Sequence, residues 1–93
     1  MSHPTTIITV VAESLPASIA AQIISLIRQG KPLAVQAIGS MAVEQAMKAA
    51  ALAWCYLEAE GIAVACFPSF AKVKIDNRER TFVRLEVRTQ PHK

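Results

Sequence analysis

The sequence predicts a two-layer α+β sandwich in which the elements follow the order β-α-β-α-β-β. Short runs rich in β-branched residues alternate with two longer segments whose apolar residues recur at helical spacing, and the last two strand-like runs are separated only by a short turn signal. Each β-α-β step crosses over right-handed and leaves its strands parallel, whereas the final pair forms a hairpin. At 93 residues the chain is expected to be one domain, residues 1–93.

The first strand and the first helix are predicted in the N-terminal third. Residues 5–11 are mostly β-branched, which is typical of a strand. Ser14 is a candidate helix cap and Pro16 suits a first helical turn, and the helical periodicity then continues until Arg28 and Gly30. The apolar residues at that spacing are Ile19, Ile23, Leu26 and Ile27.

A second strand and a longer helix follow. Residues 33–38 read as a strand after a Lys-Pro turn. Gly39 is then expected to form the turn and Ser40 to cap the helix, which spans 41–60 and ends at Gly61.

The C-terminal third predicts two strands joined by a turn. Residues 62–67 are expected to form the third strand, which Pro68 interrupts and residues 71–75 resume. A turn at 76–77 leads into a fourth strand at 81–88. Alternation along this hairpin predicts an apolar face of Val73, Ile75, Val83, Leu85 and Val87, and a charged face of Lys72, Lys74, Arg84, Glu86 and Arg88.

The chain is unusually hydrophobic for its size, since 53 % of its residues are hydrophobic and only 18 % are charged. A domain this small buries only about two thirds of the surface of its unfolded chain, so it has little interior for so many apolar side chains. The predicted helix at 41–60 is apolar around most of its circumference. Packing against a second copy, as a homodimer or a tetramer, accounts for this excess, and burial within the monomer is the alternative.

Positive charge is concentrated at the C-terminal end. The net charge is +3, but residues 1–71 carry three basic and four acidic residues, whereas residues 72–93 carry seven basic and three acidic ones. This asymmetry is typical of a surface that faces an anion, and a solvated strand face would look similar.

No constellation of residues predicts catalysis. The sequence has no Walker loop, no G-x-G-x-x-G and no nucleophile elbow, and its two histidines, His3 and His92, lie in the tails. Cys55 and Cys66 are expected to be small buried hydrophobes. We therefore expect no enzymatic activity, no cofactor and no metal site.

A nucleic-acid site is predicted at the edge of the sheet where the parallel strands end. Both helix N-termini and the tip of the basic hairpin are expected there, and the carboxylate of Glu13, in the loop that enters the first helix, opposes an anion. Aromatic residues do not interleave with basic ones along the sequence, which favours a duplex over a single strand. DNA, more than RNA, is the expected partner. The predicted phosphate contacts are the side chains of Arg78, Arg80, Lys74 and Lys72 and the backbone N–H groups of Gly39 and Ser40.

Four motifs carry a resemblance to a known family: VQAIG at 35–39, VEQAMKA at 43–49, CFPSF at 66–70 and KIDNRERT at 74–81. They resemble the bacterial stage V sporulation protein S family, over residues 8–87. That family is similar in fold to the Alba superfamily of dimeric nucleic-acid-binding proteins. The resemblance implies a four-stranded mixed sheet of order 1-2-4-3 with two helices on one face, and a non-enzymatic, regulatory homodimer linked to sporulation and development.

Two positions depart from the pattern of that family. Glu13 stands where the family usually has a lysine, which weakens the expectation of strong DNA affinity. Asn77 stands where an Asp-Gly turn is usual, and asparagine tolerates the left-handed conformation that the turn needs.

A regulatory module that binds a protein or a small anion is the alternative function, and a purely structural assembly unit is the third. The longest uncharged stretch, 14–27, is too short for a membrane span, which needs ~20 residues, and no secretory signal is recognisable at the N-terminus. A cytoplasmic protein without membrane contact is expected.

Overall fold

A computed structural model of the chain describes residues 4–91 and confirms the predicted order of elements. Observed bounds lie within two residues of the expected ones, except for the last strand, which extends three residues further at both ends. The elements are β1 (Thr6–Val10), α1 (Pro16–Arg28), β2 (Leu33–Ala37), α2 (Ser40–Glu58), β3 (Ile62–Ile75) and β4 (Arg78–Pro91).

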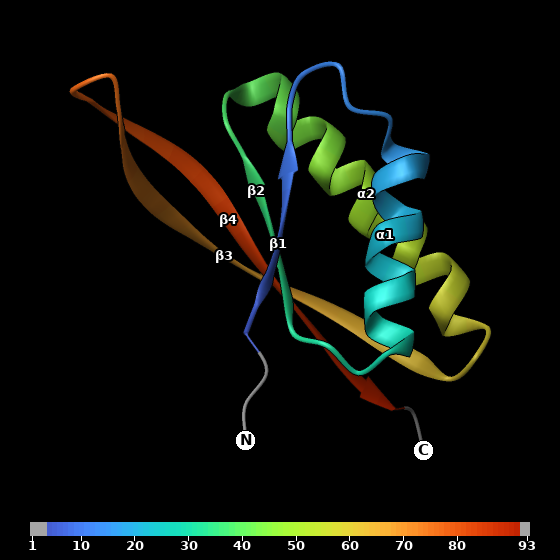
Figure 1. Cartoon of the computed structure of the whole chain (residues 1–93). Coiled ribbons are helices and arrows are strands. Elements are labelled where there is room, and N and C mark those ends of the chain that lie inside the picture. Colours follow the sequence, from blue (N-terminus) through green and yellow to red (C-terminus); the bar gives the residue numbers. More distant parts are fainter. Residues whose placement is uncertain (1–3, 92–93) are drawn as a thin grey trace.

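The strands form one four-stranded mixed sheet of order β1-β2-β4-β3, as the resemblance implied. β1 and β2 are parallel, and β4 is antiparallel to both β2 and β3. β3 therefore runs in the same direction as β1 and β2, and the C-terminal ends of all three point the same way. Figure 1 shows both helices on one side of the sheet, with the start of α2, the loop after β1 and the tip of the hairpin toward the same end of the molecule.

The core lies between the two helices and this side of the sheet. α2 buries a stripe of small residues at helical spacing, and alanine lets the helix lie close to the strands because it has only a methyl side chain. Leu57 of α2 and Ile23 of α1 are the largest fully buried helix residues, and Val10 and Val35 are the largest fully buried residues of the sheet. The buried α2 residues are Ala42, Ala46, Ala49, Ala53 and Leu57.

Neither predicted serine cap forms. At the start of α1 the N-cap position is Leu15, and the hydroxyl of Ser14 instead accepts a hydrogen bond from the backbone N–H of Val11 at 3.0 Å. At α2 the N-cap position is Gly39, with φ +90°, and Ser40 is the first helical residue. Both serines were predicted one residue away from the position at which a side chain can cap a helix.

Pro68 does not interrupt the third strand, which runs unbroken from Ile62 to Ile75. The reason is its position in the sheet, because β3 has a partner, β4, on one side only. An edge strand accepts proline when the missing N–H would have pointed to the open side. The register opposes Pro68 to Leu85 without a break.

The far part of the hairpin projects beyond the sheet. β2 pairs only with residues 83–87 of β4, so residues 71–82 pair with one another alone. We call residues 71–82 the arm, and Figure 1 shows it extending away from the body of the domain. Asp76 and Asn77 form its turn with φ of +52° and +62°, which is the backbone of a tight two-residue hairpin turn.

Candidate nucleic-acid interface

The register of the arm places its charged residues on two different faces. Directly opposed residues of antiparallel strands share a face of the sheet. Arg78 is opposed to Ile75 and Arg80 to Val73, whereas Glu79 is opposed to Lys74. The alternation predicted within each strand is confirmed, but the predicted match between the faces of the two strands was wrong. Val73 and Ile75 lie on the face of the arginines, and Lys72 and Lys74 lie with Glu79 and Thr81 on the other face.

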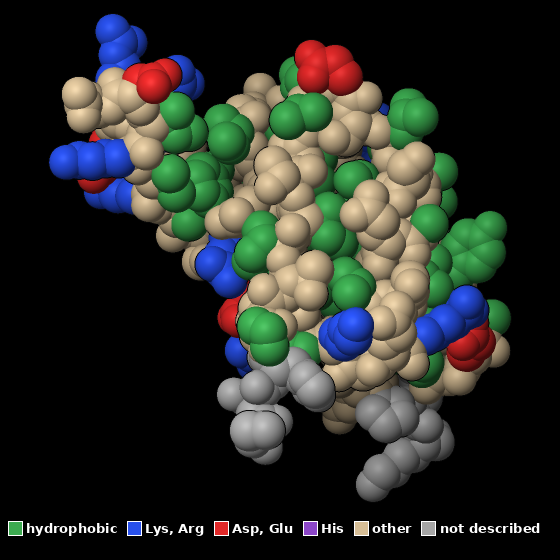
Figure 2. All heavy atoms as spheres, viewed as in Figure 1, with side chains coloured by type: hydrophobic (Ala, Val, Ile, Leu, Met, Phe, Trp, Pro, Cys, Tyr) green, Lys and Arg blue, Asp and Glu red, His purple; other side chains and the backbone are tan. Residues whose placement is uncertain are grey.

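The two faces also differ in how far their charges are already neutralised. The Lys72 ammonium lies 3.7 Å from a Glu79 carboxylate oxygen, and both side chains are exposed. Within residues 4–91, Arg78 and Arg80 form no ion pair. The arginine face thus carries the charge that is most available to an anionic partner. Figure 2 shows basic side chains gathered at the far end of the arm, with acidic side chains among them.

Gly39 and Ser40 lie at the base of the arm and not at its tip. They line an open hollow of about 380 Å³ together with Thr81 and Phe82, and none of the four predicted basic residues, all of which the structure describes, lines it. Phe82 is only 6 % exposed although it lies outside the main core, so its ring anchors the arm to the body. The further lining residues, Ala37, Val43, Phe70 and Val83, make the hollow mainly apolar.

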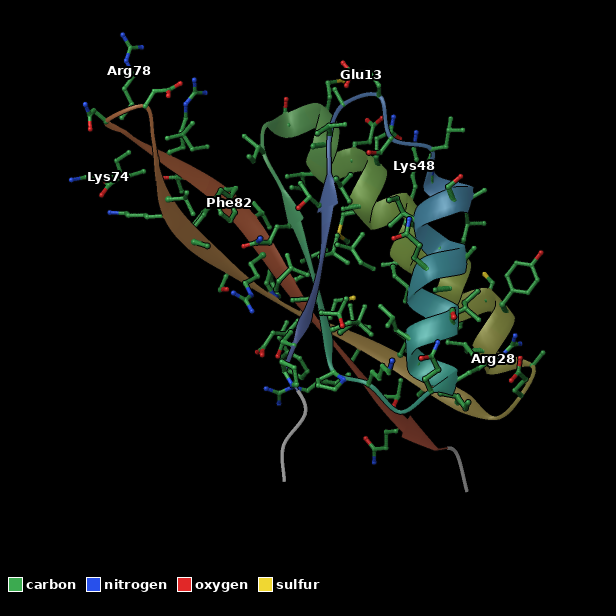
Figure 3. All side chains as sticks on the ribbon, in the orientation of Figure 1. Glu13, Arg28, Lys48, Lys74, Arg78 and Phe82 are labelled. Carbon is green, nitrogen blue, oxygen red and sulfur yellow. The ribbon has the colours of Figure 1, made fainter. Side chains whose placement is uncertain are left out.

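Glu13 lies in the loop after β1, and a hydrogen bond ties this loop to α2. The side-chain amide of Gln45 donates to the carbonyl oxygen of Ala12 at 3.2 Å. Figure 3 shows Glu13 at the same end of the molecule as Arg78, with Arg78 out on the arm and Phe82 where the arm meets the sheet. The parts of the predicted site therefore lie toward the same end of the molecule, but they are spread over the loop after β1, the start of α2 and the arm.

Sequence reasoning missed one pair on the face of the sheet without helices. The Arg88 guanidinium lies 4.8 Å from the centre of the Phe67 ring, which is within cation–π range. The expectation that aromatic and basic residues do not interleave is wrong here, because β3 and β4 bring together residues 21 positions apart in the chain. Only the register between β3 and β4 could have revealed this pair, because Phe67 is opposed to Glu86 and Arg88 is the diagonal neighbour of Phe67 on the same face.

The two cysteines differ in their exposure. Cys55 is exposed and Cys66 is half-buried, which corrects the expectation that both are core residues. Burial raises the pKa of the Cys66 thiol. In the part of the chain that the structure describes, no three His, Cys, Asp or Glu side chains gather as metal ligands. His3 and His92 lie outside the described residues.

Neither α1 nor α2 is long and apolar enough to cross a membrane.

The fold and the surface together define a small two-layer α+β protein with a projecting two-stranded basic arm, in which both helices of residues 4–91 lie on one side of the sheet. A comparison with known families identifies it further. The family model of stage V sporulation protein S (SpoVS) matches residues 6–90. The chain therefore belongs to the SpoVS family, which is a family of sporulation-related proteins.

Proposed function

We propose that the protein is a non-enzymatic, cytoplasmic regulator that binds nucleic acid as a homodimer and prefers duplex DNA. The observation that carries the proposal is the arm, a two-stranded ribbon that stands free of the sheet and has basic side chains on both faces. A two-stranded ribbon fits the major groove of B-DNA. Phosphate contacts from arginine and lysine would hold it there without reading the sequence.

Within the arm, Arg78 and Arg80 contribute most to this binding. Both are exposed and unpaired within residues 4–91, whereas Lys72 already has Glu79 as a partner. Lys74 adds a further positive charge on the lysine face. Gly39 and Ser40 lie where a phosphate beside the base of the arm would meet the first N–H groups of α2, and no side chain caps that helix. Glu13 lowers the positive potential at this end of the molecule.

Homodimer formation is supported by the apolar surface that one copy leaves open. One stripe of α2 at helical spacing is formed by Val43, Met47, Ala50 and Trp54. Met47 is 52 % exposed and Trp54 is 42 % exposed, and Val43 lines the same hollow as the highly exposed Phe70. A second copy on this stripe would remove these side chains from water, which would account for the excess of hydrophobic residues.

The binding proposal is tested with fluorescence anisotropy on labelled duplex DNA, single-stranded DNA and RNA at a series of salt concentrations. We expect duplex binding that weakens steeply with salt. Absence of binding to every probe at low salt contradicts the proposal. Capture of one specific protein partner that survives high salt would favour the alternative of a protein-binding module.

Assembly is tested by light scattering coupled to gel filtration. The wild type should elute with twice the 10.1 kDa mass of the chain, and Met47→Glu with Trp54→Glu should elute as a monomer because both substitutions place charge in the apolar stripe. Tyr56→Glu is the matched control, since Tyr56 is 65 % exposed on the side of α2 that faces α1. A wild-type monomer at micromolar concentration contradicts the assignment of the stripe.

A further inference from the structure

The face of the sheet without helices carries a row of arginines along β4. Val83, Leu85 and Val87 of β4 lie on the face of the sheet that packs against the helices, so the residues that alternate with them along β4 lie on the other face. At about 3.3 Å per residue the row is roughly 33 Å long. Glu86 is the only carboxylate that the strand registers of residues 4–91 place on this face. The row consists of Arg78, Arg80, Arg84 and Arg88.

An aromatic ring lies beside this row and stays accessible. Phe67 on β3 is 49 % exposed even with the Arg88 guanidinium stacked over its ring. Arg88 is held from two sides, because its guanidinium also pairs with a Glu86 carboxylate oxygen at 3.3 Å. The ring and the guanidinium therefore form an ordered, planar platform on an otherwise open sheet face.

The neighbours of Arg84 on this face are polar and uncharged. Ser69 of β3 and Gln36 of β2 are both directly opposed to Arg84 in the sheet. Their hydroxyl and amide groups can donate and accept hydrogen bonds, as the edge of a nucleobase requires. Arg84 forms no ion pair within residues 4–91, so its charge is available to a phosphate.

We propose that this face binds one unpaired strand of nucleic acid, with a base stacked on Phe67 and the sugar-phosphate backbone following the arginine row. The inference rests on the proposed nucleic-acid function and adds a second surface to it. A base exposes its π-face to a protein ring only when it is unstacked from its neighbours, so the platform selects single strands. A duplex offers its grooves and phosphates to the arm but no free base to Phe67.

The experiment measures the affinity of the full chain for labelled oligothymidylate, which has little structure of its own, and for a labelled duplex of mixed sequence. Phe67→Leu should weaken oligothymidylate binding about five- to a hundredfold and leave duplex binding unchanged. Arg84→Gln should weaken oligothymidylate binding and reduce its salt dependence. Tyr56→Leu is the matched control, because Tyr56 is an exposed aromatic residue on a helix. Circular dichroism verifies that each variant is folded.

A photochemical measurement reports on the contact directly. Oligothymidylate that carries 5-bromodeoxyuridine should cross-link under ultraviolet light to the peptide that contains Phe67, as identified by mass spectrometry. Cross-links confined to the arm contradict the proposal.

The outcomes separate this inference from the function on which it rests. If Phe67→Leu binds oligothymidylate like the wild type while duplex binding depends on Arg78 and Arg80, the inference fails and the proposed function stands. If oligothymidylate binding depends on Phe67 and no duplex binds, the inference stands and the preference for duplex DNA fails. If the wild type binds neither probe, both fail.

Discussion

Replacing both arginines of the arm tests the proposed duplex contact most directly. In Arg78→Gln with Arg80→Gln, two exposed guanidinium groups without ion pairs within residues 4–91 are lost, and each is available for one phosphate. Each phosphate contact contributes about 0.9 to the slope of log affinity against log salt, so the double variant should lose about 1.8. When salt is raised from about 50 to about 200 mM, the fold-decrease in affinity of the wild type should therefore be about twelve times that of the variant.

The assay is anisotropy of a labelled duplex, titrated at several salt concentrations for each protein. Lys72→Gln should reduce the slope by less than one contact, because Glu79 already neutralises part of the Lys72 charge. Lys48→Gln is the control for a positive charge lost outside the arm: it changes the net charge by one, as Lys72→Gln does, and Lys48 lies on α2 in an exposed ion pair with Glu44. A double variant with the wild-type slope, or a Lys48 variant with the same loss, would refute the assignment of phosphate contacts to the arm.

Other predictions concern stability and thiol chemistry. Leu57→Ala should lower the free energy of unfolding by about 2–5 kcal/mol in urea denaturation, because Leu57 is fully buried and the neighbouring elements can fill the cavity only in part. Ser40→Ala should change it by less than about 0.5 kcal/mol, since this serine forms no cap hydrogen bond; a loss of about 1 kcal/mol would mean that it caps α2 after all. Asn77→Gly should keep or raise the melting temperature, whereas Asn77→Ala should lower stability by about 1–2 kcal/mol, because φ is +62° at this position. With iodoacetamide near neutral pH, Cys66 should react more slowly than the exposed Cys55. Because burial raises the pKa of the Cys66 thiol, its reaction rate should continue to increase with pH above the usual thiol pKa. Equal rates for the two cysteines in a mass-spectrometric time course would contradict this.

The order of elements was predictable because each element has its own local signal. β-branched runs, helical spacing, glycine and the short turn are all read from neighbouring residues, and the structure places an element at each of them. Strand order is not local, and it came from the family resemblance. The effect of Pro68 depended on that order, because only an edge strand tolerates a proline at mid-length.

The faces of the hairpin could not be predicted from alternation within each strand. Alternation shows which residues of one strand share a face, but the register between strands decides which face of the neighbour they join. A two-residue turn opposes Ile75 to Arg78, so odd positions of β3 meet even positions of β4. The missed contact of Phe67 with Arg88 has the same origin, because it exists only across two strands.

The long third strand has a consequence for solubility. β3 spans 14 residues at the edge of the sheet, and an open edge of that length can pair with the edge of another molecule and start aggregation. Proline and lysine are residues with which proteins block such edges, and β3 has Pro68 near its middle and Lys72 and Lys74 toward its end. Pro68 thus limits edge-to-edge pairing between copies, while the lysines repel a second edge and also provide charge to the arm.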